Sequence, residues 1–211
     1  MILIIAVIAG RVIPFFAGVV IPGIKPVQKI WVEIFSFASL TAFSFSSVFW
    51  EYSKSTAALA ALAALAHLIR WALWRPWETV RIPILFVLYV GYFWIPVGLT
   101  LGGLAAMGFL PPSIAIHALT VGCIGTMIYG MITRVSLGHA GRPIRPNHFI
   151  VLGYALISIA ALARVWGPWI LPQQSLLAFE LSGGLWVLAH LIFLIVYAPI
   201  LCRPRIDGKA G

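Results

Sequence analysis

A histidine, repeated glycines and a group of cations occur together in residues 117–146, HALTVGCIGTMIYGMITRVSLGHAGRPIRP. The segment opens on His117, continues as an apolar run, and ends in a polar stretch with His139 and three arginines. An imidazole inside an apolar helix is costly unless it is paired or hydrated, and glycines permit close helix approach. The segment therefore predicts a tightly packed helix that faces something polar.

Sulfur side chains recur at helical spacing in the same segment. Cys123, Met127 and Met131 are four residues apart and so fall on one face of a helix. Thiolate and thioether are soft ligands that suit Cu(I). Cys123 and Met127, with the histidines at positions 117 and 139, are therefore candidate metal ligands, and plain packing of the sulfur side chains is the alternative.

His67 and His190 each lie inside another apolar run, at similar depths if both runs cross a bilayer in the same direction. Two neutral imidazoles on facing helices can hold a b-type haem iron from both sides. The alternative is that each histidine forms a hydrogen bond to a carbonyl or hydroxyl group on a neighbouring helix.

His117 and His139 are separated by roughly 30 Å along a helix that rises about 1.5 Å per residue. They cannot share one metal unless the loop after the helix folds back into the membrane. Glu180 lies at a depth comparable to that of His117 and could orient its imidazole. An ordinary histidine near a helix start is the other interpretation.

Three arginines of the segment, Arg134, Arg142 and Arg145, could contact haem propionates or anionic lipid. Arg11 and Glu33 both lie near the inner end of their apolar runs, and a structural ion pair between them is expected.

Composition identifies the solvent of the folded chain. Of 211 residues, 62% are hydrophobic and 9% are charged, and the mean hydropathy is +1.06. A soluble domain carries about 25% charged residues, so this surface must face lipid. The net charge of +9 is scattered over short loops, which excludes a nucleic-acid-binding face. Two cysteines provide no disulfide framework and no zinc spacing.

Seven apolar runs are each long enough to cross a bilayer as a helix. The predicted fold is therefore an all-α, polytopic membrane bundle that forms one domain over residues 1–211. The expected spans are Met1–Val20, Trp31–Trp50, Thr56–Trp74, Ile82–Leu104, Ser113–Thr133, Phe149–Val165 and Leu176–Leu201.

Basic residues predict the orientation of these spans. The first side receives twelve: Arg11, Lys25, Lys29, Arg70, Arg75, Arg81, Arg134, Arg142, Arg145, Arg203, Arg205 and Lys209. The second side receives Lys54 and Arg164. Because cytoplasmic loops are enriched in Lys and Arg, the C-terminus is expected in the cytoplasm and the N-terminus outside.

Several classes of enzyme are not indicated. The sequence has no phosphate-binding loop, dinucleotide fingerprint, HExxH motif or catalytic triad pattern. Nothing in it points to a hydrolase, a kinase or a nucleic-acid enzyme.

Three segments resemble the NnrS family of membrane proteins associated with the bacterial response to nitric oxide. They are GRVIPFF (Gly10–Phe16), HALTVGCIGTM with TRVSLGHAGRP (within His117–Pro143), and YAPILCRPRIDGKAG (Tyr197–Gly211). The stretch Arg70–Leu99 is also similar.

This resemblance implies a haem- and copper-containing protein of the bacterial inner membrane that acts in nitric oxide metabolism or in protection from nitrosative stress. Members of the family are longer, and this chain corresponds to their C-terminal half, which makes a separate or missing N-terminal half an expected partner. Matched to the motif residue by residue, His117 and His139 are the carried-over ligand candidates.

Three functions remain open at this stage. The first is a haem- and copper-binding protein with nitric oxide as its ligand. The second is a transporter or permeation half-unit, since glycine and proline in GYFWIPVGL could break a helix along a pathway. The third is a cofactor-free structural or assembly subunit.

Overall fold

Seven long helices account for the seven apolar runs of the sequence. The computed structural model describes residues 1–50 and 52–208, and this part of the chain contains no strand. Its seven membrane-spanning candidates confirm the predicted all-α bundle. In chain order the elements are α1 (Ile2–Val20), α2 (Ile30–Phe49), α3 (Lys54–Leu73), η1 (Pro76–Thr79), α4 (Pro83–Ala106), α5 (Pro112–His117), η2 (Ala118–Gly125), α6 (Thr126–His139), α7 (His148–Ile170), η3 (Pro172–Gln174) and α8 (Ser175–Leu201).

The fifth span runs further than its apolar residues predict. Elements α5, η2 and α6 form one continuous helix, Pro112–His139, whereas the sequence suggested an end at Thr133. Two polar residues near the predicted end of this span have contacts within the bundle. The Thr133 hydroxyl donates to the Gly130 carbonyl at 2.8 Å, and the Arg134 guanidinium lies 3.7 Å from the centre of the Phe16 ring of α1.

The sixth span is also longer than expected. Helix α7 begins at a capped end, where the Asn147 side chain accepts a hydrogen bond from the Ile150 backbone at 3.0 Å. It passes through Pro168 and ends at Ile170. A proline near the end of a helix removes only one hydrogen bond, so the last turn persists.

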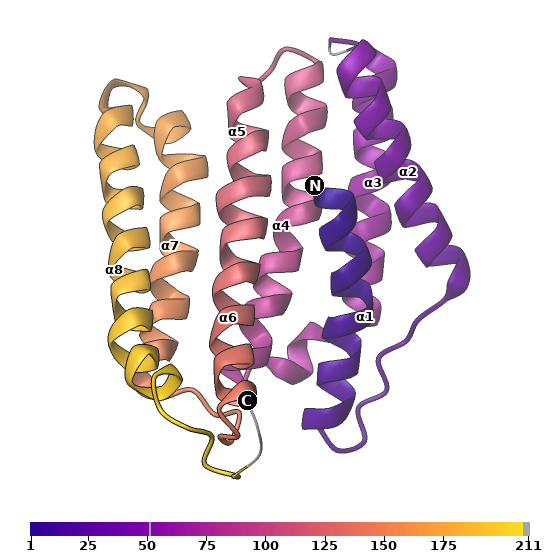
Figure 1. Cartoon of the computed structure of the whole chain (residues 1–211). Helices are drawn as coiled ribbons and strands as arrows, with labels where there is room; N and C mark the ends of the chain where they lie inside the picture. Colours follow the sequence, from indigo (N-terminus) through magenta and orange to yellow (C-terminus); the bar gives the residue numbers. More distant parts are fainter. Residues whose placement is uncertain (51, 209–211) are drawn as a thin grey trace.

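Helix α4 is the centre of the bundle. It packs against α1, α3, α5, α6 and α7, and it is the most buried of the seven spans (Figure 1). Helices α2 and α3 form one edge of the molecule, and α7 and α8 form the other. Helix α8 is the least buried span, and its outward side chains are mostly leucine and isoleucine, which suits lipid as the surrounding solvent.

The basic loops gather at one end of the bundle. Residues 21–29, 74–82, 140–147 and 202–208 lie at the lower end in Figure 1. Two of the twelve cations assigned to this side, Arg70 and Arg134, are instead buried within helices, and Lys209 lies outside the described residues. The described loops otherwise keep the predicted charge asymmetry.

Candidate functional site

A buried ion pair lies between α2 and α3. Arg70 Nε donates to Glu33 Oε1 at 2.8 Å, and Arg70 Nη2 contacts Glu33 Oε2. The Arg70 side chain is 1% exposed and that of Glu33 is 23% exposed. A charge buried in an apolar bundle persists only when it is paired and its remaining donors are satisfied.

This pairing corrects the expectation of a bond between Arg11 and Glu33. Arg11 is exposed on α1, while Arg70 is buried among three aromatic rings and also donates to the Ala6 carbonyl at 2.9 Å. Arg70 had been placed in a loop because it lies near the end of its apolar run. The available signal was its position three residues after His67, on the same helix face.

Tyr92 connects Arg70 to His67. The Tyr92 hydroxyl oxygen accepts from Arg70 Nη1 at 2.9 Å and lies 2.6 Å from His67 Nδ1. Guanidinium groups only donate, so the hydroxyl hydrogen of Tyr92 is available to donate to His67 Nδ1. This arrangement assigns the imidazole proton of His67 to Nε2.

The far side of the His67 ring is enclosed. His67 is fully buried, and its Nε2 has no hydrogen-bond partner among residues 1–50 and 52–208. The backbone of Ser36 lies close to the ring, and the buried Ser36 hydroxyl likewise lacks a partner in the described chain. The contacts favour the hydrogen-bonding interpretation of His67, and its role as a haem ligand stays a prediction.

Cys123 and Met127 are brought together by an unusual helix segment. Residues Ala118–Gly125 form a π-helix between α5 and α6, and such segments often mark functional sites. The Cys123 thiol donates to Met127 Sδ at 3.9 Å. Cys123 is fully buried and Met127 is 9% exposed. The third member of the sulfur stripe, Met131, is only partly buried.

The sulfur pair packs against α4. Gly91 leaves room for the Met127 side chain, because a Cβ at that position would overlap it. Gly122 does the same for the ring of Trp94. Tyr92, which contacts both Arg70 and His67, follows Gly91 directly in α4.

His117 and His139 lie at opposite ends of the fifth span, and the helix between them does not fold back. His117 is half-buried, and its ring packs edge-on against the Phe179 ring of α8, with the ring centres 6.2 Å apart. Glu180 is exposed, and Phe179 rather than this carboxylate is the neighbour of His117. His139 is exposed at the end of α6.

The proposed pair of His67 and His190 is not formed. Helices α3 and α8 lie on opposite sides of α4 and α6 (Figure 1), so the two imidazoles do not face one another. His190 Nδ1 lies 2.8 Å from the Trp186 carbonyl, and its ring stacks on the Trp186 indole at 3.9 Å. This hydrogen bond lies within α8, whereas the alternative interpretation expected a partner on a neighbouring helix.

Arg142 lies in the loop between α6 and α7. It lines a cavity of 270 Å³ with Arg145, Asn147 and Tyr197. No histidine lines this cavity, and the contact of Arg142 with a haem propionate stays a prediction.

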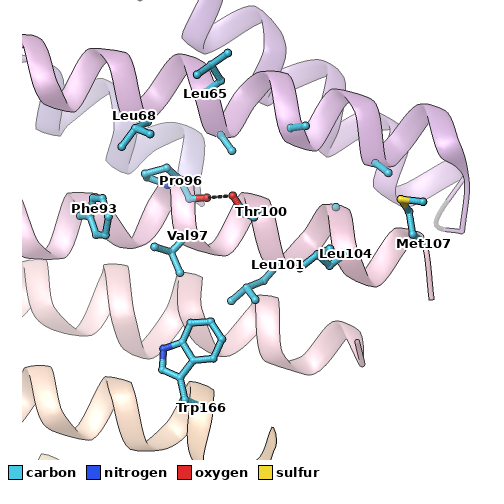
Figure 2. Close-up of a pocket in the computed structure, with 14 residues that line it drawn as sticks. Leu65, Leu68, Phe93, Pro96, Val97, Thr100, Leu101, Leu104, Met107 and Trp166 are labelled. Carbon is cyan, nitrogen blue, oxygen red and sulfur yellow. Dashed lines mark hydrogen bonds between the residues drawn. The ribbon is translucent and has the colours of Figure 1, made fainter. Parts of the chain in front are cut away.

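The largest cavity, of 670 Å³, lies between α3 and α4, with Trp166 of α7 at its edge (Figure 2). Its lining is apolar except for Thr100, whose hydroxyl donates to the Pro96 carbonyl at 2.8 Å. It carries neither a histidine nor a charged side chain. The cavity therefore offers an apolar surface but no metal ligand.

A comparison with family models decides the assignment. The model described as NnrS protein matches residues 1–205 of the 211-residue chain. The chain belongs to the NnrS family. This finding confirms the resemblance drawn from the three motif segments, and with seven apolar helices it indicates a multi-pass membrane protein. No curated protein and no solved structure matches the chain.

NnrS membership implies copper and haem. The residues of this chain provide candidate ligands for copper more clearly than for haem. Two metal–sulfur bonds of about 2.3 Å each can span up to about 4.6 Å, so one ion can reach both Cys123 and Met127 at their separation of 3.9 Å. Within the described residues no group of three or more His, Cys, Asp or Glu side chains could hold a metal. Copper therefore fits as a two-sulfur site on a single helix.

Haem fits these residues less well than copper does. A haem site needs a cavity into which an imidazole nitrogen points. In five cavities of residues 1–50 and 52–208, of 270 to 670 Å³, no histidine belongs to the lining. His67 is enclosed by Tyr92 and its neighbours. Of the two histidines in the family motif, His117 has a half-buried ring and His139 is exposed.

Proposed function

We propose that this NnrS-family chain is a bacterial inner-membrane protein of the response to nitric oxide and nitrosative stress, with copper held by Cys123 and Met127. One observation carries the proposal. Two soft sulfur ligands, Cys123 of the π-helix and Met127 of the first turn of α6, lie 3.9 Å apart and are shielded from solvent. Soft ligands in an apolar site select Cu(I) over harder cations.

The surrounding residues define how such a site would work. The Cys123 thiol proton must leave when the sulfur binds a metal, because thiolate is the ligand form. Bound Cu(I) supplies a one-electron centre at which nitric oxide can bind.

No histidine lines the cavities described above, so a haem site on this chain would need a further surface. We infer that the half-buried face of His117, next to Phe179, is completed by the N-terminal half of the protein as a partner. Absorbance tests this inference: co-expression of both halves is expected to give a Soret band that nitric oxide shifts and that His117→Ala removes. A Soret band in the present chain alone that survives His117→Ala would contradict it.

The copper proposal is tested by metal analysis of purified protein. The wild-type chain, expressed with copper, is expected to retain stoichiometric copper, while Cys123→Ser and Met127→Leu lose most of it. Met131→Leu is the matched control, because it removes a thioether from the same helix outside the pair. Retention of wild-type copper in Cys123→Ser, or no copper in the wild-type chain, would overturn the proposal.

A further inference from the structure

We propose that the cavity between the α6–α7 loop and the end of α8 binds a phosphate group, and that its source is the headgroup of an anionic phospholipid. The cavity has a volume of 270 Å³. It lies at the basic end of the bundle, where α6 ends and α7 begins (Figure 1). This inference is independent of the copper and haem proposals.

The polar wall of the cavity carries positive charge without a carboxylate. Arg142 and Arg145 both line it, and no acidic residue does. Arg142 is half-buried, and its Nε atom is buried with no hydrogen-bond partner in residues 1–50 and 52–208. A buried guanidinium N–H group without a partner calls for a hydrogen-bond acceptor. Phosphate oxygens suit the planar guanidinium, because they can accept two parallel hydrogen bonds from it.

The neighbouring carboxylate is already engaged. Asp207 lies near Gly141, in the loop beside the cavity, and it accepts from Arg205 Nε at 2.9 Å and from Arg205 Nη2 at 2.6 Å. The C-terminal segment is also tied to this loop, because the Ile206 backbone donates to the Ala140 carbonyl at 3.4 Å.

Helix α7 adds to the attraction for an anion. It is 23 residues long and begins at His148, directly after the cavity residue Asn147. The start of a long helix has a partial positive charge and backbone N–H groups that bind phosphate. The helix supports the site, while the two arginines and the partnerless Arg142 Nε define it.

The apolar wall favours lipid as the source of the phosphate. Leu137, Ile150, Val196 and Ile200 line the same cavity, and they belong to helices that span the membrane. A ligand with a phosphate at one end and hydrocarbon at the other would contact both walls. Cations at the cytoplasmic end of membrane helices are a recurrent means of binding anionic headgroups.

Native mass spectrometry of the purified full chain tests the proposal. Detergent-solubilised protein is titrated with phosphatidylglycerol, with phosphatidylcholine and with inorganic phosphate as a competitor. Phosphatidylglycerol is expected to bind preferentially, and Arg142→Gln/Arg145→Gln is expected to weaken it by about tenfold, the loss that follows from removing charged hydrogen bonds. Arg81→Gln is the matched control, since Arg81 is exposed at the same end of the bundle but does not line the cavity.

The outcomes separate the alternatives. Displacement of the lipid by inorganic phosphate would overturn the lipid source, because it would identify a soluble phosphate compound as the ligand. Equal retention of phosphatidylglycerol in the double variant and the wild type would overturn the site itself, as would an equal loss in Arg81→Gln. Arg145 is exposed, so the single variant Arg145→Gln is expected to fold normally and still to lose affinity. Unchanged affinity in that variant would also contradict the proposal.

Discussion

Tyr92 has a single hydroxyl that contacts two buried groups. It accepts from Arg70 and lies within hydrogen-bond distance of His67, and all three side chains are almost completely enclosed. A buried donor or acceptor that loses its partner keeps the full cost of its desolvation. The network from Glu33 to His67 is therefore a stability element whatever the protein binds.

At the residue scale, Tyr92→Phe is expected to destabilise the bundle by about 1–3 kcal/mol, because it leaves His67 Nδ1 and one N–H group of Arg70 without a partner. Thermal unfolding of the variant in detergent measures the effect. Tyr52→Phe is the control, since Tyr52 is exposed and its hydroxyl forms no hydrogen bond in the network. Equal stability of Tyr92→Phe and the wild type would show that the network does not stabilise the fold.

At the element scale, α1 is held against Arg70 through a glycine. The Arg70 guanidinium occupies the space in which a Cβ at Gly10 would lie, while a Cβ at Gly18 on the same helix would meet nothing. The close approach also lets Arg70 donate to the Ala6 carbonyl of α1. The contact between α1 and the centre of the bundle thus depends on the absence of one side chain.

Gly10→Ala is expected to lower stability by about 1–3 kcal/mol, as overpacking in a filled core does. Gly18→Ala is expected to be neutral or slightly stabilising, because alanine favours the helix by about 0.5–1 kcal/mol over glycine. Paired unfolding measurements in detergent compare the two variants. A Gly18→Ala variant as unstable as Gly10→Ala would contradict the assigned packing.

The membrane-spanning helices could be predicted from apolar composition alone, whereas the π-helix of residues Ala118–Gly125 could not. All seven spans follow from apolar length, since lipid leaves the backbone no other way to satisfy its hydrogen bonds. Hydropathy did not predict the full length of the fifth and sixth spans. In the fifth span Arg134 packs on the Phe16 ring of α1, which is a tertiary contact, and the sixth span starts at a side-chain cap formed by Asn147.

The candidate site was predicted only in part. The interval between Cys123 and Met127 predicted a shared face, and the two sulfur atoms do lie together. The ion pair of Glu33 with Arg70 was missed, because the sequence does not show which of several arginines faces a given carboxylate. The His67–His190 pair was wrong for a related reason: similar depth does not make two helices neighbours.

At the scale of the whole molecule, the basic loops and the end of α8 share one end of the bundle (Figure 1). The native cysteines report which side of the membrane this end faces. Cys202 is exposed at that end, whereas Cys123 is buried in the bundle. A membrane-impermeant maleimide is expected to label Cys202 in inverted inner-membrane vesicles and not in intact spheroplasts, because cytoplasmic loops are enriched in cations. Labelling in spheroplasts would reverse the proposed orientation, and Cys202→Ser controls for reaction at Cys123.

X-ray absorption at the copper edge of the copper-loaded chain tests the central claim most directly, because it reports the ligands of the metal itself. The pair of Cys123 and Met127 predicts two sulfur neighbours of copper in the wild type and one in Met127→Leu, with loss of the remaining copper–sulfur signal in Cys123→Ser. A copper spectrum with only nitrogen or oxygen neighbours, or one that Cys123→Ser leaves unchanged, would contradict a copper site at Cys123 and Met127.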